Sequence, residues 1–151
     1  MNDKPVLICY DGSADSRRAI EAAAELLGPR RATVLDIGPV ITGAESLATV
    51  SMVPAGGAFE EWNESDALRR AQHGAELARA AGFTAAARAE LDAPTWEGIV
   101  TVADKLDAAV IVLGSRGLDG AREVFEGSVS HDVAEHARRP VLIVPPPSGE
   151  S

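Results

Sequence analysis

The chain has 151 residues, and its 14 Lys and Arg against 23 Asp and Glu give a formal net charge of −9. This acidic balance argues against a general affinity for DNA or RNA, because neutralising a phosphate backbone requires clustered Lys and Arg. The length fits one domain, and 46% apolar residues with few aromatics predict an ordered core of Ala, Val, Ile and Leu.

Five short apolar runs have the composition of buried β-strands, and Ala-rich stretches with helical spacing separate them. The expected strands are residues 6–10, 32–37, 83–91, 108–113 and 141–144. The continuous apolarity of 108–113 indicates burial on both faces, as in the interior of a parallel sheet. Alternation of strand and helix predicts an α/β fold with a doubly wound parallel sheet.

The expected helices carry apolar stripes and end at recognisable stop signals. The first has its apolar stripe at residues 20–27 and ends at Gly28, and the second covers about 60–81 before Gly82. The third has its stripe at residues 99–106, and the fourth starts near Ser128 and stops before Pro140. In the second of these, the spacing predicts Leu68, Ala71, Ala75 and Ala78 on the inward face. Five strands and four helices fit one domain, which we place at residues 1–147.

Two segments lack a secondary-structure period. Residues 38–59 contain several Gly and two Pro and are expected to form a long loop inside the domain. Residues 148–151, which follow three consecutive prolines, are expected to be a disordered tail. The chain has no apolar run of about 18 residues and no signal-peptide pattern, so a cytoplasmic location is the expectation.

Cysteine and lysine usage excludes several kinds of site. Cys9 is the only cysteine, so neither an internal disulfide nor a CxxC site is possible, and its place in an apolar run predicts a buried thiol. The two lysines, Lys4 and Lys105, do not follow a glycine, which excludes a P-loop. His131 and His136 are five apart on a helix, where two metal ligands would not share a face.

Small and polar residues follow the first and fourth expected strands. Asp11-Gly12-Ser13 comes after the first, and a segment beginning Gly114-Ser115-Arg116-Gly117 comes after the fourth and leads to Gly127-Ser128 at a helix start. Glycine backbone and free helix N–H groups can cradle a phosphate without lysine. The alternative is a tight turn at Gly114 and Gly117 followed by an ordinary Ser128 N-cap.

The spacing Gly114-x2-Gly117-x9-Gly127-Ser128 resembles the nucleotide-binding signature of the universal stress protein family at every fixed position. Asp11-Gly12-Ser13 and the closing segment Arg139-Pro140-Val141-Leu142-Ile143-Val144 are also similar to that family. The resemblance covers nearly the whole chain except residues 38–59 and the tail.

The resemblance implies a five-stranded parallel sheet in the order 3-2-1-4-5, with ATP, ADP or AMP between the first and fourth strands. It implies that Asp11 lies at the ribose and Ile37 at the adenine. The remaining implied binding residues line the ribose and phosphates: Gly12, Ser13, Leu113, Gly114, Arg116, Gly117, Gly127, Ser128 and Val129. A carboxylate such as Asp11 suits ribose hydroxyls, whereas facing phosphate directly would require a metal such as Mg²⁺.

Some positions depart from the family pattern. Glu126 replaces a usually aliphatic residue, Glu123 adds a second charge to the loop, and Asp36 stands where the family often has His. Arg116 and Arg122 are the cations nearest to the glycine segment in sequence, and Arg binds phosphate well.

The sequence therefore predicts an ATP-binding universal stress protein that acts as a regulatory or stress-response module with at most slow hydrolysis. No catalytic residue is assigned, since no general base, arginine finger or GxSxG elbow is evident. An ATP-hydrolysing or adenylyl-transferring enzyme on the same fold, and a dimeric interaction module without nucleotide, remain alternatives. The resemblance also implies a homodimer through the edge strand Val141–Val144.

Overall fold

A computed structural model of the chain describes residues 3–37, 58–90, 95–115 and 129–145. The strands are β1 (Val6–Tyr10), β2 (Arg31–Asp36), β3 (Thr84–Ala89), β4 (Val110–Gly114) and β5 (Val141–Val144). The helices in these residues are α1 (Ala14–Leu27), α3 (Ala58–Ala81), α4 (Thr95–Leu106) and α5 (Val129–His136). The expected loop at 38–59 lies almost wholly, and the expected tail wholly, outside the described residues.

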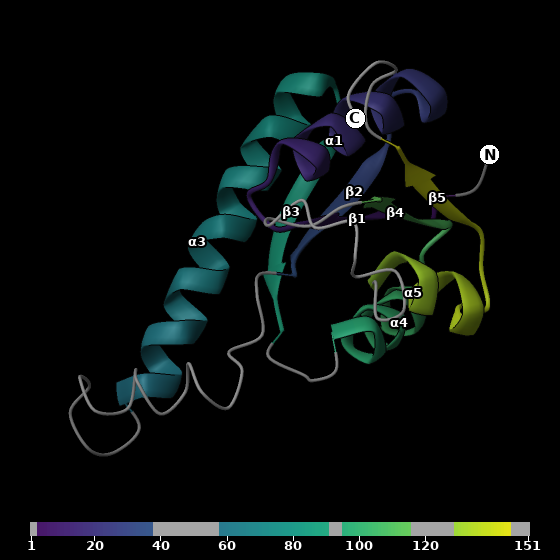
Figure 1. Cartoon of the computed structure of the whole chain (residues 1–151). Helices are drawn as coiled ribbons and strands as arrows, with labels where there is room; N and C mark the ends of the chain where they lie inside the picture. The colour runs from purple at the N-terminus through teal and green to yellow at the C-terminus, as the bar shows by residue number, and fades with distance from the viewer. Residues whose placement is uncertain (1–2, 38–57, 91–94, 116–128, 146–151) are drawn as a thin grey trace.

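All five strands are parallel and form one sheet in the order β3-β2-β1-β4-β5 (Figure 1). This confirms the α/β class and the expected strand order. The observed strands differ from the expected ones mainly at their ends; β3, for example, covers 84–89 of the expected 83–91. A helix follows each of the first four strands along the chain, and because all the strands are parallel, they end at the same edge of the sheet.

Helices cover both faces of the sheet (Figure 1). On one face, α1 and α3 pack against a cluster that includes Val6, Ile8 and Tyr10; on the other, α4 and α5 pack against one that includes Leu7 and Cys9. Successive β1 side chains therefore enter opposite cores, and all five are buried. Burial raises the pKa of the Cys9 thiol, and the nearby Asp11 charge adds to this effect.

The inward face of α3 differs from the expected one at its first position. Leu68 is 40% exposed, whereas Ala67, Ala71, Ala75 and Ala78 are buried. The close contact between α3 and the sheet centres on small side chains, and Leu68 lies about 100° around the helix from Ala67. The prediction of an inward Leu68 was therefore wrong, and the neighbouring alanine takes that place.

Candidate functional site

The carboxyl ends of β1, β2 and β4 meet at one edge of the sheet, which we call the carboxyl edge. In open parallel sheets, ligands bind outside this edge where the strand order reverses, here between β1 and β4. The residues at these strand ends are Asp11 after β1, Asp36 and Ile37 at the end of β2, and Gly114 at the end of β4. Asp11 and Asp36 are both buried, which is unusual for a carboxylate and directs attention to this edge.

The turn after β1 fixes the position of Asp11. Its Oδ1 accepts the Ser13 N–H at 2.9 Å, and the backbone between them turns through Gly12 at φ +86°. Among the described residues, no hydrogen bond to Asp11 Oδ2 is formed.

Two serines then start α1 at this edge. Ser13 is the N-cap, and its Oγ accepts the Ser16 N–H at 3.1 Å. The Ser16 hydroxyl donates back to the Ser13 carbonyl at 2.9 Å and accepts the Asp11 N–H at 3.4 Å. This buried network holds the end of β1 and the beginning of α1 as one rigid unit.

Gly114 allows the end of β4 to lie directly against α1. A Cβ atom at Gly114 would be 3.0 Å from the Asp15 carbonyl oxygen and 3.1 Å from its carbon. The first turn of α1 therefore contacts β4 backbone to backbone, and any other residue would separate them. Leu113, the preceding residue, is buried in the cluster under α4 and α5.

Ile37 extends β2 by one residue toward the same edge. Its N–H donates to the Tyr10 carbonyl at 2.9 Å, and its side chain packs on the α4 and α5 side of the sheet. The backbone N–H is therefore already used. Ile37 can offer a ligand only its carbonyl oxygen and its side chain.

Asp36 points to the other face, where it meets Arg70 of α3. The Arg70 Nε donates to Asp36 Oδ1 at 2.9 Å, and Nη2 donates to Oδ2 at 3.1 Å. This paired geometry is the strong form of an arginine–carboxylate contact. The hydrogen bond to Asp36 raises the pKa of the Arg70 guanidinium, which burial opposes, so this side chain stays charged.

The structure brings together part of the predicted site. Asp11, Gly12, Ser13, Ile37 and Gly114 lie on adjoining segments of the carboxyl edge. Val129 is the first residue of α5 and packs against the same core as Ile37. The remaining predicted loop residues lie outside the described residues: Arg116, Gly117, Arg122, Glu123, Glu126, Gly127 and Ser128.

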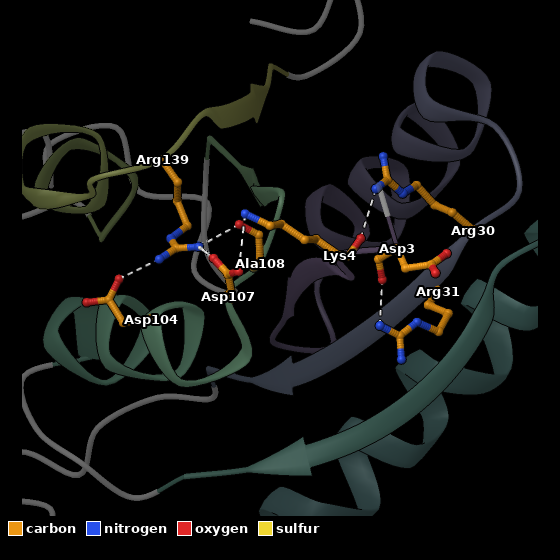
Figure 2. Close-up of polar contacts among 8 residues, drawn as sticks. All are labelled: Asp3, Lys4, Arg30, Arg31, Asp104, Asp107, Ala108 and Arg139. Atoms are coloured by element: carbon orange, nitrogen blue, oxygen red, sulfur yellow. Dashed lines mark hydrogen bonds and ion pairs between the residues drawn. The ribbon is translucent and has the colours of Figure 1, made fainter. Parts of the chain in front are cut away.

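The opposite edge, where the strands begin, carries exposed charges instead (Figure 2). Arg139 donates to the Ala108 carbonyl at 2.6 Å and to Asp104 at 2.8 Å, and Lys4 pairs with Asp107 at 3.1 Å. Beside them lies an open groove of about 410 Å³, in which Arg30 and Arg31 donate to the backbone carbonyls of the N-terminal segment.

Metal and membrane signals are absent from the part of the chain that the structure describes. No three His, Cys, Asp or Glu side chains gather there in a way that could hold a metal ion. None of the described helices combines the length and apolarity that crossing a membrane requires.

The parallel sheet, its helices on both faces and the polar carboxyl edge define a single-domain α/β protein of the doubly wound, Rossmann-like class. The sequence profile of the universal stress protein family matches residues 3–145. The chain is 33% identical over 144 residues to universal stress protein YxiE of Bacillus subtilis, covering 92% of this chain and 97% of that protein. The chain therefore belongs to the universal stress protein family.

Solved structures share the fold. That of hypothetical protein MJ0577 matches with a TM-score of 0.75 and 20% identity, over 99% of this chain and 100% of the other. A universal stress protein solved in complex with cAMP matches with a TM-score of 0.60 and 23% identity, over 95% of this chain and 98% of the other. At these identities the likeness concerns the fold.

Sequence reasoning missed Arg70. Its neighbours on α3 gave an apolar stripe, and nothing in that stripe marks an arginine as a partner of a strand residue 34 positions earlier. The one available signal was Asp36 itself, a carboxylate at the end of a buried strand, which requires a cation or hydrogen-bond donor nearby. Ser16 was missed in the same way, because its role depends on the turn geometry.

Proposed function

We propose that this chain binds an adenine nucleotide, ATP in the first place, at the carboxyl edge between β1 and β4, and acts as a nucleotide-dependent module of the cytoplasmic stress response. The observation that carries the proposal is the fixed Asp11 carboxylate at the point where the strand order reverses. Its Oδ2, without a hydrogen-bond partner among the described residues, suits a ribose hydroxyl donor.

The other contacts divide by chemistry. The Ile37 carbonyl is an acceptor for the amino group of adenine, and its side chain provides apolar contact with the base. Leu113 and Gly114 border the ribose and the phosphate path, where glycine gives the backbone close access to a ligand.

The residues proposed to bind the phosphates lie mostly outside the described residues. We assign the phosphates to backbone N–H groups and the hydroxyl at a helix start, together with one arginine. The proposed residues are Gly12, Ser13, Arg116, Gly117, Gly127, Ser128 and Val129. Mg²⁺ bound to the phosphates is the expected counter-ion in a chain of net charge −9. The family relative solved with cAMP supports an adenine ligand.

Titration calorimetry of the full chain with ATP and Mg²⁺ tests this function. The wild type should bind, and Gly117→Val or Gly127→Val should abolish binding because a side chain would occupy the space of the phosphates. Asp11→Asn keeps an acceptor for the Ser13 N–H and should weaken binding by about tenfold through its altered ribose contact. Glu25→Gln, an exposed α1 carboxylate, is the matched control and should bind like the wild type.

Absence of both binding heat and a thermal shift at millimolar ATP would refute the proposal. Hydrolysis should be slow, because the assigned residues bind phosphate and include no general base. Steady, rapid turnover that Asp11→Asn removes while binding persists would instead favour the enzymatic alternative.

We also propose a homodimer through β5. This strand pairs with β4 alone in the described sheet, and Ile143 on it is 37% exposed. An apolar strand at a sheet edge favours pairing with a second copy. Sedimentation of the wild type at tens of micromolar should give a dimer, and Leu142→Pro should give a monomer; a monomeric wild type would contradict this assignment.

A further inference from the structure

A glycine sets the distance between α3 and the carboxyl half of the sheet. A Cβ atom at Gly74 would lie 2.8 Å from the Tyr10 ring and 2.8 Å from Val34 Cγ1, which is closer than side chains can approach. The helix therefore rests directly on β1 and β2. Arg70 lies one turn before Gly74 on the same side of the helix, which brings its guanidinium to the end of β2.

At that point Arg70 holds Asp36 through two parallel hydrogen bonds. The Asp36 side chain is 5% exposed, whereas that of Arg70 is 37% exposed. The Asp36 carboxylate is thus buried, whereas the Arg70 guanidinium that pairs with it is partly exposed to solvent. Both members have fixed positions because the two-bond contact permits only one relative orientation.

Arg70 also acts on a second carboxylate. In the register of β1 and β2, Tyr10 pairs with Asp36, so Asp11 and Asp36 occupy the ends of adjacent strands. The pKa of Arg70 is raised mainly by its hydrogen bond to Asp36. The negative charges of Asp36, Asp66 and Asp11 raise it further, in that order. Arg70 therefore pairs directly with Asp36 and lies close enough to Asp11, at the end of the adjacent strand, for their charges to interact.

These two carboxylates oppose an anionic ligand. Repulsion between like charges is weakly screened where the groups are buried, and it increases with the number of charges on the ligand. A nucleoside without phosphate would not experience it. A ligand with phosphates bound beside β1 therefore gains from a positive charge near the ends of β1 and β2, in addition to any charge that contacts the phosphates directly.

We propose that Arg70, held in place by Asp36, is a specificity-determining positioning residue that supplies this compensation and so favours phosphorylated adenine nucleotides over adenosine. The inference rests on the proposed nucleotide-binding function and adds the residue by which the site distinguishes phosphorylated nucleotides from adenosine. A purely structural Arg70, which only ties α3 to β2, would affect all ligands equally. The two roles therefore differ in how the effect of a substitution depends on ligand charge.

Titration calorimetry with ATP, AMP and adenosine, in the presence of Mg²⁺, tests the inference on the full chain. Arg70→Gln should weaken ATP and AMP by about five- to tenfold each and leave adenosine within about twofold of the wild type.

Arg69→Gln is the matched control. Arg69 precedes Arg70 on α3, is 78% exposed and pairs with Asp66 at 3.5 Å, so its substitution removes the same charge from the same turn without contact to Asp36. All three ligands should bind this variant within about twofold of the wild type. The double variant Asp36→Asn with Arg70→Gln removes both charges, and it should recover most of the affinity for ATP and AMP.

Each other outcome overturns the inference. An equal loss for adenosine in Arg70→Gln would indicate the structural role, and an equal loss in Arg69→Gln would indicate bulk charge. Failure of the double variant to recover affinity would show that the Asp36 charge is not what Arg70 compensates. A wild type that binds none of the three ligands would refute the proposed function and this inference together, whereas binding with no dependence on ligand charge refutes this inference alone.

Discussion

The two edges of the sheet use charged residues in opposite ways. At the carboxyl edge, Asp11 and Asp36 are buried, and one oxygen of Asp11 has no hydrogen-bond partner among the described residues. At the amino edge, the exposed Lys4 and the mostly buried Arg139 pair with carboxylates and a backbone carbonyl (Figure 2). Charges at both edges hold chain segments together, but at the carboxyl edge they are buried carboxylates, and the proposed nucleotide site uses the oxygen of Asp11 that no described residue contacts.

The largest expected effect comes from separating α3 from the carboxyl half of the sheet. Gly74→Ala places a methyl group 2.8 Å from the Tyr10 ring and should lower the free energy of unfolding. We expect a net loss of about 2 kcal/mol, since overpacking outweighs the gain in helix propensity. Nucleotide affinity should fall as well, because Arg70 moves with the helix.

Denaturant unfolding and nucleotide titration measure the two parts of this prediction. Gln72→Ala, on the exposed side of the same turn, is the control for helix propensity. A variant with unchanged stability and unchanged affinity would show that the contact between α3 and the sheet does not set the position of Arg70.

Breaking the amino edge should affect stability alone. Arg139→Gln removes the donor to the Ala108 carbonyl and the pairing with Asp104, and it should cost about 1 to 1.5 kcal/mol of unfolding free energy. Affinity for ATP should remain within about twofold of the wild type, since the proposed nucleotide site lies at the opposite edge. The measurements are a urea unfolding curve and a calorimetric titration of one preparation.

The adjacent residue provides the control for Arg139. Arg138→Gln removes the same charge from an exposed side chain and should leave both stability and affinity unchanged. A clear loss of affinity in Arg139→Gln would contradict the separation of the two edges.

The smallest effect concerns acid stability at the amino edge. The hydrogen bond from Lys4 lowers the pKa of Asp107, and Arg139 contributes to the same effect. A carboxyl whose pKa is lowered on folding adds stability above its ordinary value of about 3.9 and loses it as the pH falls through the lowered value. Asp107→Asn should therefore have a slightly lower Tm than the wild type near neutral pH.

The difference in Tm should vanish in acid, once the pH has fallen through the lowered pKa and the wild-type carboxyl is protonated. Asn tolerates the backbone at φ +50° that residue 107 adopts, so the substitution introduces no strain of its own. An equal difference in Tm between variant and wild type at neutral and acid pH would mean that the charge of Asp107 does not contribute to stability.

The sequence predicted the architecture well because local patterns carry it. Continuous apolar runs marked the strands, and the glycine spacing led to the family and thus to the strand order. The burial of Cys9 was predicted from its apolar neighbours and is confirmed. Leu68 was misplaced because a helical stripe predicts a face only to within about one residue, and the close contact of α3 with the sheet decides which residue faces inward.

The candidate site was less accessible to the sequence. Asp11 was found because it follows a strand directly, but the pairing of Asp36 with Arg70 joins residues 34 apart through the packing of a helix on a sheet. The Gly74 contact that permits this pairing involves one side chain from β1 and one from β2. Such relations depend on how elements pack, and no local pattern records them.

The complete burial of β1 limits how a protein of this kind can change its ligand. All five β1 side chains lie in one or the other core, so substitutions along that strand would disturb packing on a face of the sheet. Ile37, which directly follows β2 and is only partly buried, carries less of this constraint. A substitution that alters the contact with a ligand is therefore tolerated more easily where a strand leaves the sheet than within β1.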